Sequence, residues 1–89
     1  MMYEYMELSD QTLITHSQLI EKVGQKTVQV HFERPKAGGF DMARCELPSY
    51  TWIKRDGFTD AEIERFTELL QHNAHLLFRY AENGGILSA

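Results

Sequence analysis

The sequence predicts an α+β fold in which a three- to four-stranded antiparallel meander packs on one long C-terminal helix (β-β-β-α). The 89 residues suffice for one domain. Residues 26–34 and 40–47 alternate apolar and polar side chains, as half-buried strands do. Residues 59–83 instead repeat apolar side chains with the period of an α-helix. We therefore expect a single domain over 1–89, with the sheet in 12–53 and the helix in 59–83.

The strands are delimited by turn signals. Residues 12–22 form the first clear strand, and the tight turn 23–25 leads into the second strand over 26–34. Pro35 is expected to end that strand, because proline cannot donate to a strand ladder. A third strand follows over 40–47. The expected inward positions of these two strands are Val28, Val30, Phe32, Ala43, Cys45 and Leu47, and the outward positions of the second are Gln29, His31 and Glu33.

Two segments have more than one interpretation. Residues 1–11 are consistent with a short edge strand or with a flexible tail. Residues 49–54 carry three large apolar side chains and are consistent with an extra strand or a helical turn. We expect three or four strands in total.

The helix is the best-determined element. Thr59 and Glu62 form a capping box, and Phe58 with Ile63 matches a hydrophobic staple. The run Asn83-Gly84-Gly85 is a typical helix stop. At 100° per residue, one apolar stripe contains Ile63, Phe66, Leu70, Ala74, Leu77 and Ala81. Further apolar side chains on one flank are Leu69, Leu76 and Tyr80.

Composition narrows the class of protein. The formal net charge of -4 removes the usual electrostatic driver of nucleic-acid binding. The single cysteine excludes an intramolecular disulfide framework. No apolar run approaches the roughly 20 residues of a membrane span, and the acidic start lacks the features of a secretory signal. We expect a cytoplasmic protein that does not bind membranes and needs no cofactor.

Motifs for catalysis are missing from the sequence. It has no phosphate-binding loop, no C-x-x-C and no nucleophile elbow. His72 and His75 lie on the polar arc of the helix, and a metal site would need at least a third ligand. Cys45 occupies a core-facing strand position, where a small buried hydrophobe is expected. We predict no catalytic residues and no metal site. A small enzyme or metal-binding protein would have to use His31, Glu33, His72 and His75.

A lone sheet with one helix has an uncovered face and a marginal core, which indicates a partner. The candidate partner or dimer surface consists of apolar residues on the helix flank and on the second sheet face: Leu69, Leu76, Tyr80, Ile14, Ile20, Phe40 and Met42. His16 is expected on that second face as well. Asn73 lies at the edge of the apolar stripe, where a buried amide must find a hydrogen-bond partner. Candidate ligand contacts are Asn73, Tyr50 and Trp52.

Residues 28–77 resemble a small bacterial family of domains of unknown function. The resemblance lies in the strand "VQVHFE", the linker "ELPSYTWIKRDGF" and the helix "GFTDAEIERFTELLQHNAHLL". This helix is similar to the family pattern G-F-[ST]-x-x-E-[LI] followed by N-x-x-x-L-L, although this sequence has one residue fewer in the second part, N-A-H-L-L. It implies a strand meander followed by a helix, in a bacterial protein with a gene-pair context such as a toxin–antitoxin module. It implies no catalytic residues.

The leading hypothesis is a non-catalytic domain that binds another protein or forms a homo-oligomer, such as a homodimer. An alternative is a nucleic-acid-binding or toxin–antitoxin-type regulatory component. Its candidate contacts are Arg34, Lys36, Arg44, Lys54 and Arg55.

Overall fold

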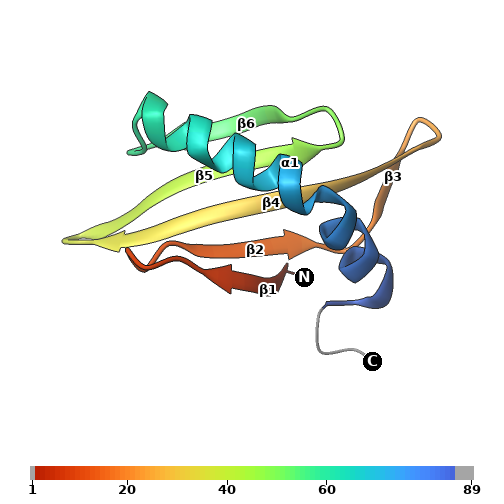
Figure 1. Ribbon diagram of the computed structural model, residues 1–89, viewed down its shortest axis with the longest axis horizontal. Helices are drawn as coiled ribbons and strands as arrows, with labels where there is room; N and C mark the ends of the chain where they lie inside the picture. Colours follow the sequence, from red (N-terminus) through yellow and green to blue (C-terminus); the bar gives the residue numbers. More distant parts are fainter. Residues whose placement is uncertain (1, 86–89) are drawn as a thin grey trace.

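The computed structural model describes residues 2–85, which form one antiparallel sheet of six strands with a helix lying across one face (Figure 1). The elements are β1 (Met2–Glu7), β2 (Leu13–Ser17), β3 (Ile20–Lys22), β4 (Gln25–Lys36), β5 (Gly39–Leu47), β6 (Thr51–Asp56) and α1 (Asp60–Asn83). The predicted α+β class and the antiparallel sheet with a C-terminal helix are confirmed. Met1 and residues 86–89 of the predicted domain lie outside the described residues.

The sheet is a meander with the spatial order β1-β2-β4-β5-β6, and β3 pairs only with the start of β4. The predicted count of three to four strands was too low. Residues 2–7 form an edge strand rather than a tail, and residues 51–56 form a strand on the opposite edge. The sequence was ambiguous at both places because edge strands bury only one row of side chains and alternate weakly.

The predicted first strand is divided in two, because a side chain replaces a ladder hydrogen bond. The Oγ of Ser17 accepts a hydrogen bond from the backbone N–H of Gln29 at 3.0 Å. The chain then leaves the β2 ladder, and the N–H of Leu19 donates to the carbonyl of Ala81 in α1 at 3.4 Å. Pairing with β4 resumes at Ile20. Side-chain competition with backbone pairing of this kind is typical of serine.

The turn predicted between β3 and β4 is present. Val23 and Gly24 both have positive φ, 47° and 78°, as the two central residues of a type I′ hairpin turn require. The prediction that Pro35 ends β4 was wrong, since the strand continues to Lys36. Pairing between β2 and β4 stops at Leu13 and Glu33. Proline is tolerated at Pro35 because no β2 residue remains beside it to accept an N–H.

The core lies between the sheet and α1. The predicted inward positions of β4 and β5 are all buried, and so is the helix stripe apart from the half-buried Ala74. The rings of Phe32 and Phe66 stack with centroids 4.3 Å apart. These two rings join the centre of the sheet to the middle of the helix.

Both predicted ends of the helix are confirmed. Thr59 Oγ1 accepts from the N–H of Glu62 at 3.2 Å, and Glu62 Oε1 accepts from the N–H of Thr59 at 3.0 Å. Gly84 adopts φ 76° at the C-cap, and its N–H donates to the carbonyl of Tyr80. Within residues 2–85, no helix has the length and apolar character needed to cross a membrane.

Candidate functional site

The face of the sheet opposite α1, here called the open face, is not covered by any other element of residues 2–85 (Figure 1). The predicted placement of Ile14 and His16 on this face was wrong. Both are fully buried on the helix side, and Ile14 pairs with Phe32 in the adjoining strand. The mixed polarity of β2 concealed this, because His16 is buried between aromatic neighbours on β1 and not in solvent.

A polar row crosses the middle of the open face. Strand register places Thr15, His31, Arg44 and Lys54 side by side on β2, β4, β5 and β6. Burial lowers the pKa of His31, and the positive charge of Arg44 lowers it further, whereas Glu33 acts in the opposite direction. Among the described residues, His31 Nε2 and Arg44 Nε are buried without a hydrogen-bond partner. Within residues 2–85, no carboxylate is hydrogen-bonded to the His31 ring.

At one corner of the open face, a shallow pocket of about 480 Å³ lies next to the β4–β5 turn. The six residues that line this corner pocket are Glu7, Gln11, Leu13, Glu33, Pro35 and Phe40. Leu13, Pro35 and Phe40 form the apolar floor of the pocket, and Phe40 keeps 55% of its surface exposed. Phe40 pairs with Pro35 across the hairpin, which keeps both side chains on this face. Large apolar side chains exposed together are typical of an interaction surface.

Two carboxylates flank the apolar floor of the corner pocket. Glu7, Leu13 and Glu33 are neighbours in register on three adjacent strands, with the leucine between the glutamates. Within residues 2–85, neither glutamate has a hydrogen bond or an ion pair with another side chain. The pocket therefore combines apolar surface with uncompensated negative charge. A matching ligand carries an apolar group with a cation beside it.

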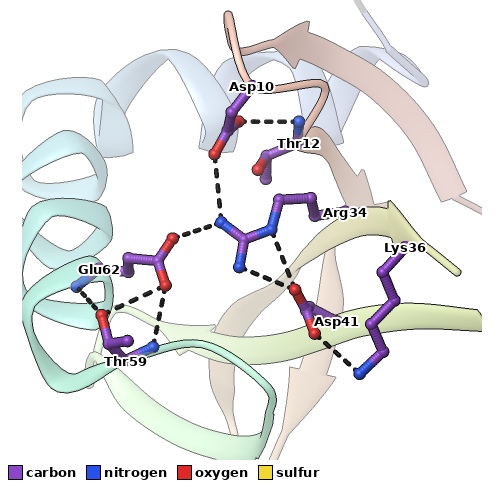
Figure 2. Close-up of polar contacts among 7 residues, drawn as sticks. All are labelled: Asp10, Thr12, Arg34, Lys36, Asp41, Thr59 and Glu62. Carbon is purple, nitrogen blue, oxygen red and sulfur yellow. Dashed lines mark hydrogen bonds and ion pairs between the residues drawn. The ribbon is translucent and has the colours of Figure 1, made fainter.

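The charged cluster at the start of α1 is structural. Figure 2 shows Arg34 among three carboxylates from different segments: Nη2 lies 2.8 Å from Asp41 Oδ2, Nη1 lies 3.3 Å from Asp10 Oδ2, and Nη1 also pairs with Glu62. The guanidinium lies over the ring of Phe58, 4.7 Å from its centroid. These contacts connect the β1–β2 loop, β4, β5 and α1.

The pKa values of the cluster follow from these contacts. The hydrogen bonds from Arg34 lower the pKa of Glu62 and of Asp41, and carboxylate partners raise the pKa of Arg34. The pKa of Asp10 is lowered first by its hydrogen bond with Thr12 and also by Arg34. Arg34, Asp41 and Glu62 therefore favour one another's charged forms, and Thr12 together with Arg34 favours that of Asp10.

The basic residues considered for nucleic-acid binding do not form a continuous surface. Arg34 and Lys36 are paired within the charged cluster, Lys36 Nζ lying 3.0 Å from Asp41 Oδ1. Arg55 pairs with Asp60 at the start of the helix. Arg44 and Lys54 remain as cross-strand neighbours on the open face. Two adjacent cations make a short patch, and phosphate backbones are usually bound by several.

The histidines of the alternative metal site are far apart in the fold. His72 and His75 are exposed on the outer side of α1, whereas His31 and Glu33 lie on the open face beyond the sheet. The Nδ1 of His72 is already 2.9 Å from the carbonyl of Glu68. Within residues 2–85, no three histidine, cysteine, aspartate or glutamate side chains are grouped so as to hold a metal ion.

The candidate ligand contacts serve the packing between helix and sheet. Asn73 Oδ1 accepts from the hydroxyl of Tyr5 at 2.5 Å, and its Nδ2 donates to the carbonyl of Leu69 at 2.7 Å. The indole N–H of Trp52 donates to Thr67 Oγ1 at 3.1 Å. Tyr50 packs against the core from the β5–β6 turn with φ 57°. Asn73 therefore has the hydrogen-bond partner that its position requires, and this partner is the side chain of Tyr5 on β1.

The candidate partner residues on the helix flank are half-buried. Leu69 packs on the core and lines a second depression of about 450 Å³ beside Asp10 and Arg65. Tyr80 lies 6.1 Å from the ring of Tyr5, measured between centroids. Leu76 is half-buried as well, and so is Ile20 on β3. Of the predicted partner residues, Phe40 alone lines the corner pocket, and Met42 is the register neighbour of Glu33.

Cys45 is fully buried beneath the helix, and burial raises the pKa of its thiol to about 12. We expect a thiol-specific disulfide reagent to leave the folded protein unmodified at neutral pH and to modify it fully once urea has unfolded the chain, because the thiolate is the reactive species. Absorbance of the released reagent anion measures this. Rapid modification of the folded chain would contradict the assignment of Cys45 as a core residue.

Comparison with family models, with curated proteins and with solved structures finds no match for this chain. The resemblance of residues 28–77 to a bacterial family stays a prediction. Sequence reasoning missed most of the corner pocket. Two features of the sequence indicate this pocket. Leu13 must face the opposite side of the sheet from Ile14, and Pro35 can pair with Phe40 across a two-residue hairpin turn.

Proposed function

We propose that this chain is a non-catalytic domain that binds another protein chain through the open face of its sheet, with the corner pocket as the anchor. The observation that carries the proposal is the apolar floor of Leu13, Pro35 and Phe40, flanked by the unpaired Glu7 and Glu33. Binding surfaces of this kind concentrate their affinity in a small apolar centre with a polar rim. The neighbouring row of Thr15, His31, Arg44 and Lys54 on the open face is polar and suits such a rim.

The experiment uses the tagged full chain as bait in a nuclease-treated lysate of its source, to which a second copy with a different tag is added. We expect wild type to retain at least one protein, another chain or its own second copy, and Phe40→Glu to lose it. The added carboxylate places a third negative charge on the apolar floor and removes its most exposed ring. Quantitative mass spectrometry of the retained proteins is the readout.

The matched control is Ile53→Glu. Ile53 is an exposed apolar residue on β6, with 49% of its surface accessible, and it does not line the corner pocket. The control should retain what wild type retains, and circular dichroism should show that both variants are folded. If no protein is retained in a way that depends on Phe40 while both variants are folded, the proposal fails.

A further inference from the structure

The turn between β3 and β4 presents a fully exposed valine. Val23 is fully exposed: its accessible area is 107% of the reference value for valine, the highest among the large apolar residues of the described chain. It occupies the first central position of the type I′ turn with φ 47°. This conformation favours asparagine, aspartate or glycine, and it is an outlier for a β-branched residue. Neither folding nor turn propensity explains a valine here.

The charges around this valine complement those of the corner pocket. Residues 21–26 contain one glutamate and two lysines, Lys22 and Lys26, on either side of Val23. Lys22 Nζ is paired with Glu46 Oε2 at 2.7 Å, whereas Lys26 has no ion pair among the described residues. The pocket has two carboxylates beside an apolar floor and no cation in its lining. A volume of about 480 Å³ exceeds that of one valine side chain and leaves room for the aliphatic stem of Lys26.

A chain cannot place its own valine in its own pocket. Pro35 follows Val23 by twelve residues along the extended β4, and the rise of a β-strand allows a separation of at most about 40 Å. The longest dimension of the molecule is 38 Å, and Figure 1 shows the β3–β4 and β4–β5 turns at its two ends. The turn and the pocket can therefore meet only between two molecules.

We propose that the corner pocket receives the β3–β4 turn of a second copy of this chain, with Val23 on the apolar floor and Lys26 near Glu7 and Glu33. This inference rests on the proposed function and names the occupant of its pocket. Since the turn and the pocket lie at opposite ends of β4, two antiparallel copies make both contacts at once. Such a pair is a closed two-fold dimer with identical contacts on each side.

Sedimentation velocity of the purified full chain tests this inference over about 10 µM to about 1 mM, the range in which weak small interfaces populate. Wild type and Ile53→Glu should dimerise. Val23→Asn should raise the dissociation constant by at least about 100-fold, because it removes the apolar side chain from both contacts. The same substitution creates an Asn-Gly type I′ turn, so the melting temperature of the monomer should not fall.

Mixing two variants separates this geometry from a general loss of folding. Val23→Asn keeps its pocket, and Phe40→Glu keeps its turn, so neither should associate alone. Their mixture retains one intact contact and should form a weak heterodimer. A mixture that stays monomeric, or a Val23→Asn chain that dimerises like wild type, would overturn the inference. Wild type that stays monomeric throughout would also overturn it, and Phe40-dependent capture of a different protein would then leave the proposed function standing.

Discussion

Replacing Phe32 with alanine is expected to lower the free energy of unfolding by about 3–5 kcal/mol, the usual cost of deleting a buried ring. Phe32 is fully buried at the centre of β4. Its ring stacks on Phe66 and lies 5.6 Å from that of Trp52, measured between centroids, so the cavity would open where helix and sheet meet. Urea denaturation followed by circular dichroism measures the change.

Phe40→Ala is the matched control, because it makes the same substitution in the same sheet on the open face. With 55% of Phe40 exposed, it should cost less than about 1 kcal/mol. If Phe40→Ala lowered the free energy of unfolding as much as Phe32→Ala, the corner pocket would be part of the folding core. That result would contradict the proposal that the open face is a binding surface.

Arg34→Met is expected to lower the free energy of unfolding by about 3 kcal/mol, in the range seen when one partner of a buried charge pair is removed. The variant keeps much of the apolar stem but leaves Asp41 and Glu62, with side chains only 10% and 14% exposed, without their guanidinium partner. Arg79→Met, on the exposed side of α1, should change stability by less than about 0.5 kcal/mol. Equal effects of the two substitutions in urea denaturation would contradict a structural role for Arg34.

The Arg34 effect should depend on pH with a defined sign. The pKa values of Glu62 and Asp41 are lowered in the folded state, so their stabilisation is present above the unfolded values of 4.5 and 3.8 and is lost as the pH falls through the folded values. The stability difference between wild type and Arg34→Met should therefore shrink below about pH 4.

The lowered pKa of His31 affects wild type and Arg34→Met alike. The stability of both proteins falls as the pH drops below 6.5, because the unfolded chain then binds the proton more readily than the folded chain.

The core and the helix could be predicted from the sequence because their signals are local. Period-2 alternation identified the inward residues of β4 and β5, and Thr59 with Glu62 identified the start of α1. The number of strands was predicted less accurately than the core and the helix. The ends of β2 and β4 depend on a hydrogen bond between Ser17 and Gln29 and on where the β2 pairing stops, and both are tertiary facts.

The candidate site could be predicted only in part, because it is assembled from three strands and a loop. Phe40 was identified as a surface residue, but Glu7, Gln11 and Leu13 join it only through strand register. The basic residues illustrate the same limit. The sequence shows no partner for Arg34, whereas the fold surrounds it with carboxylates from residues distant in the sequence, Asp10 and Glu62.

The most direct test of the account follows the backbone amide signals of the isotope-labelled chain by nuclear magnetic resonance while its concentration is raised. The account predicts concentration-dependent shifts at two distant places, the turn around Val23 and the corner around Leu13, Glu33 and Phe40, with His75 on the outer side of α1 unchanged. Shifts confined to the helix surface, or none at any concentration, would contradict self-association through the corner pocket.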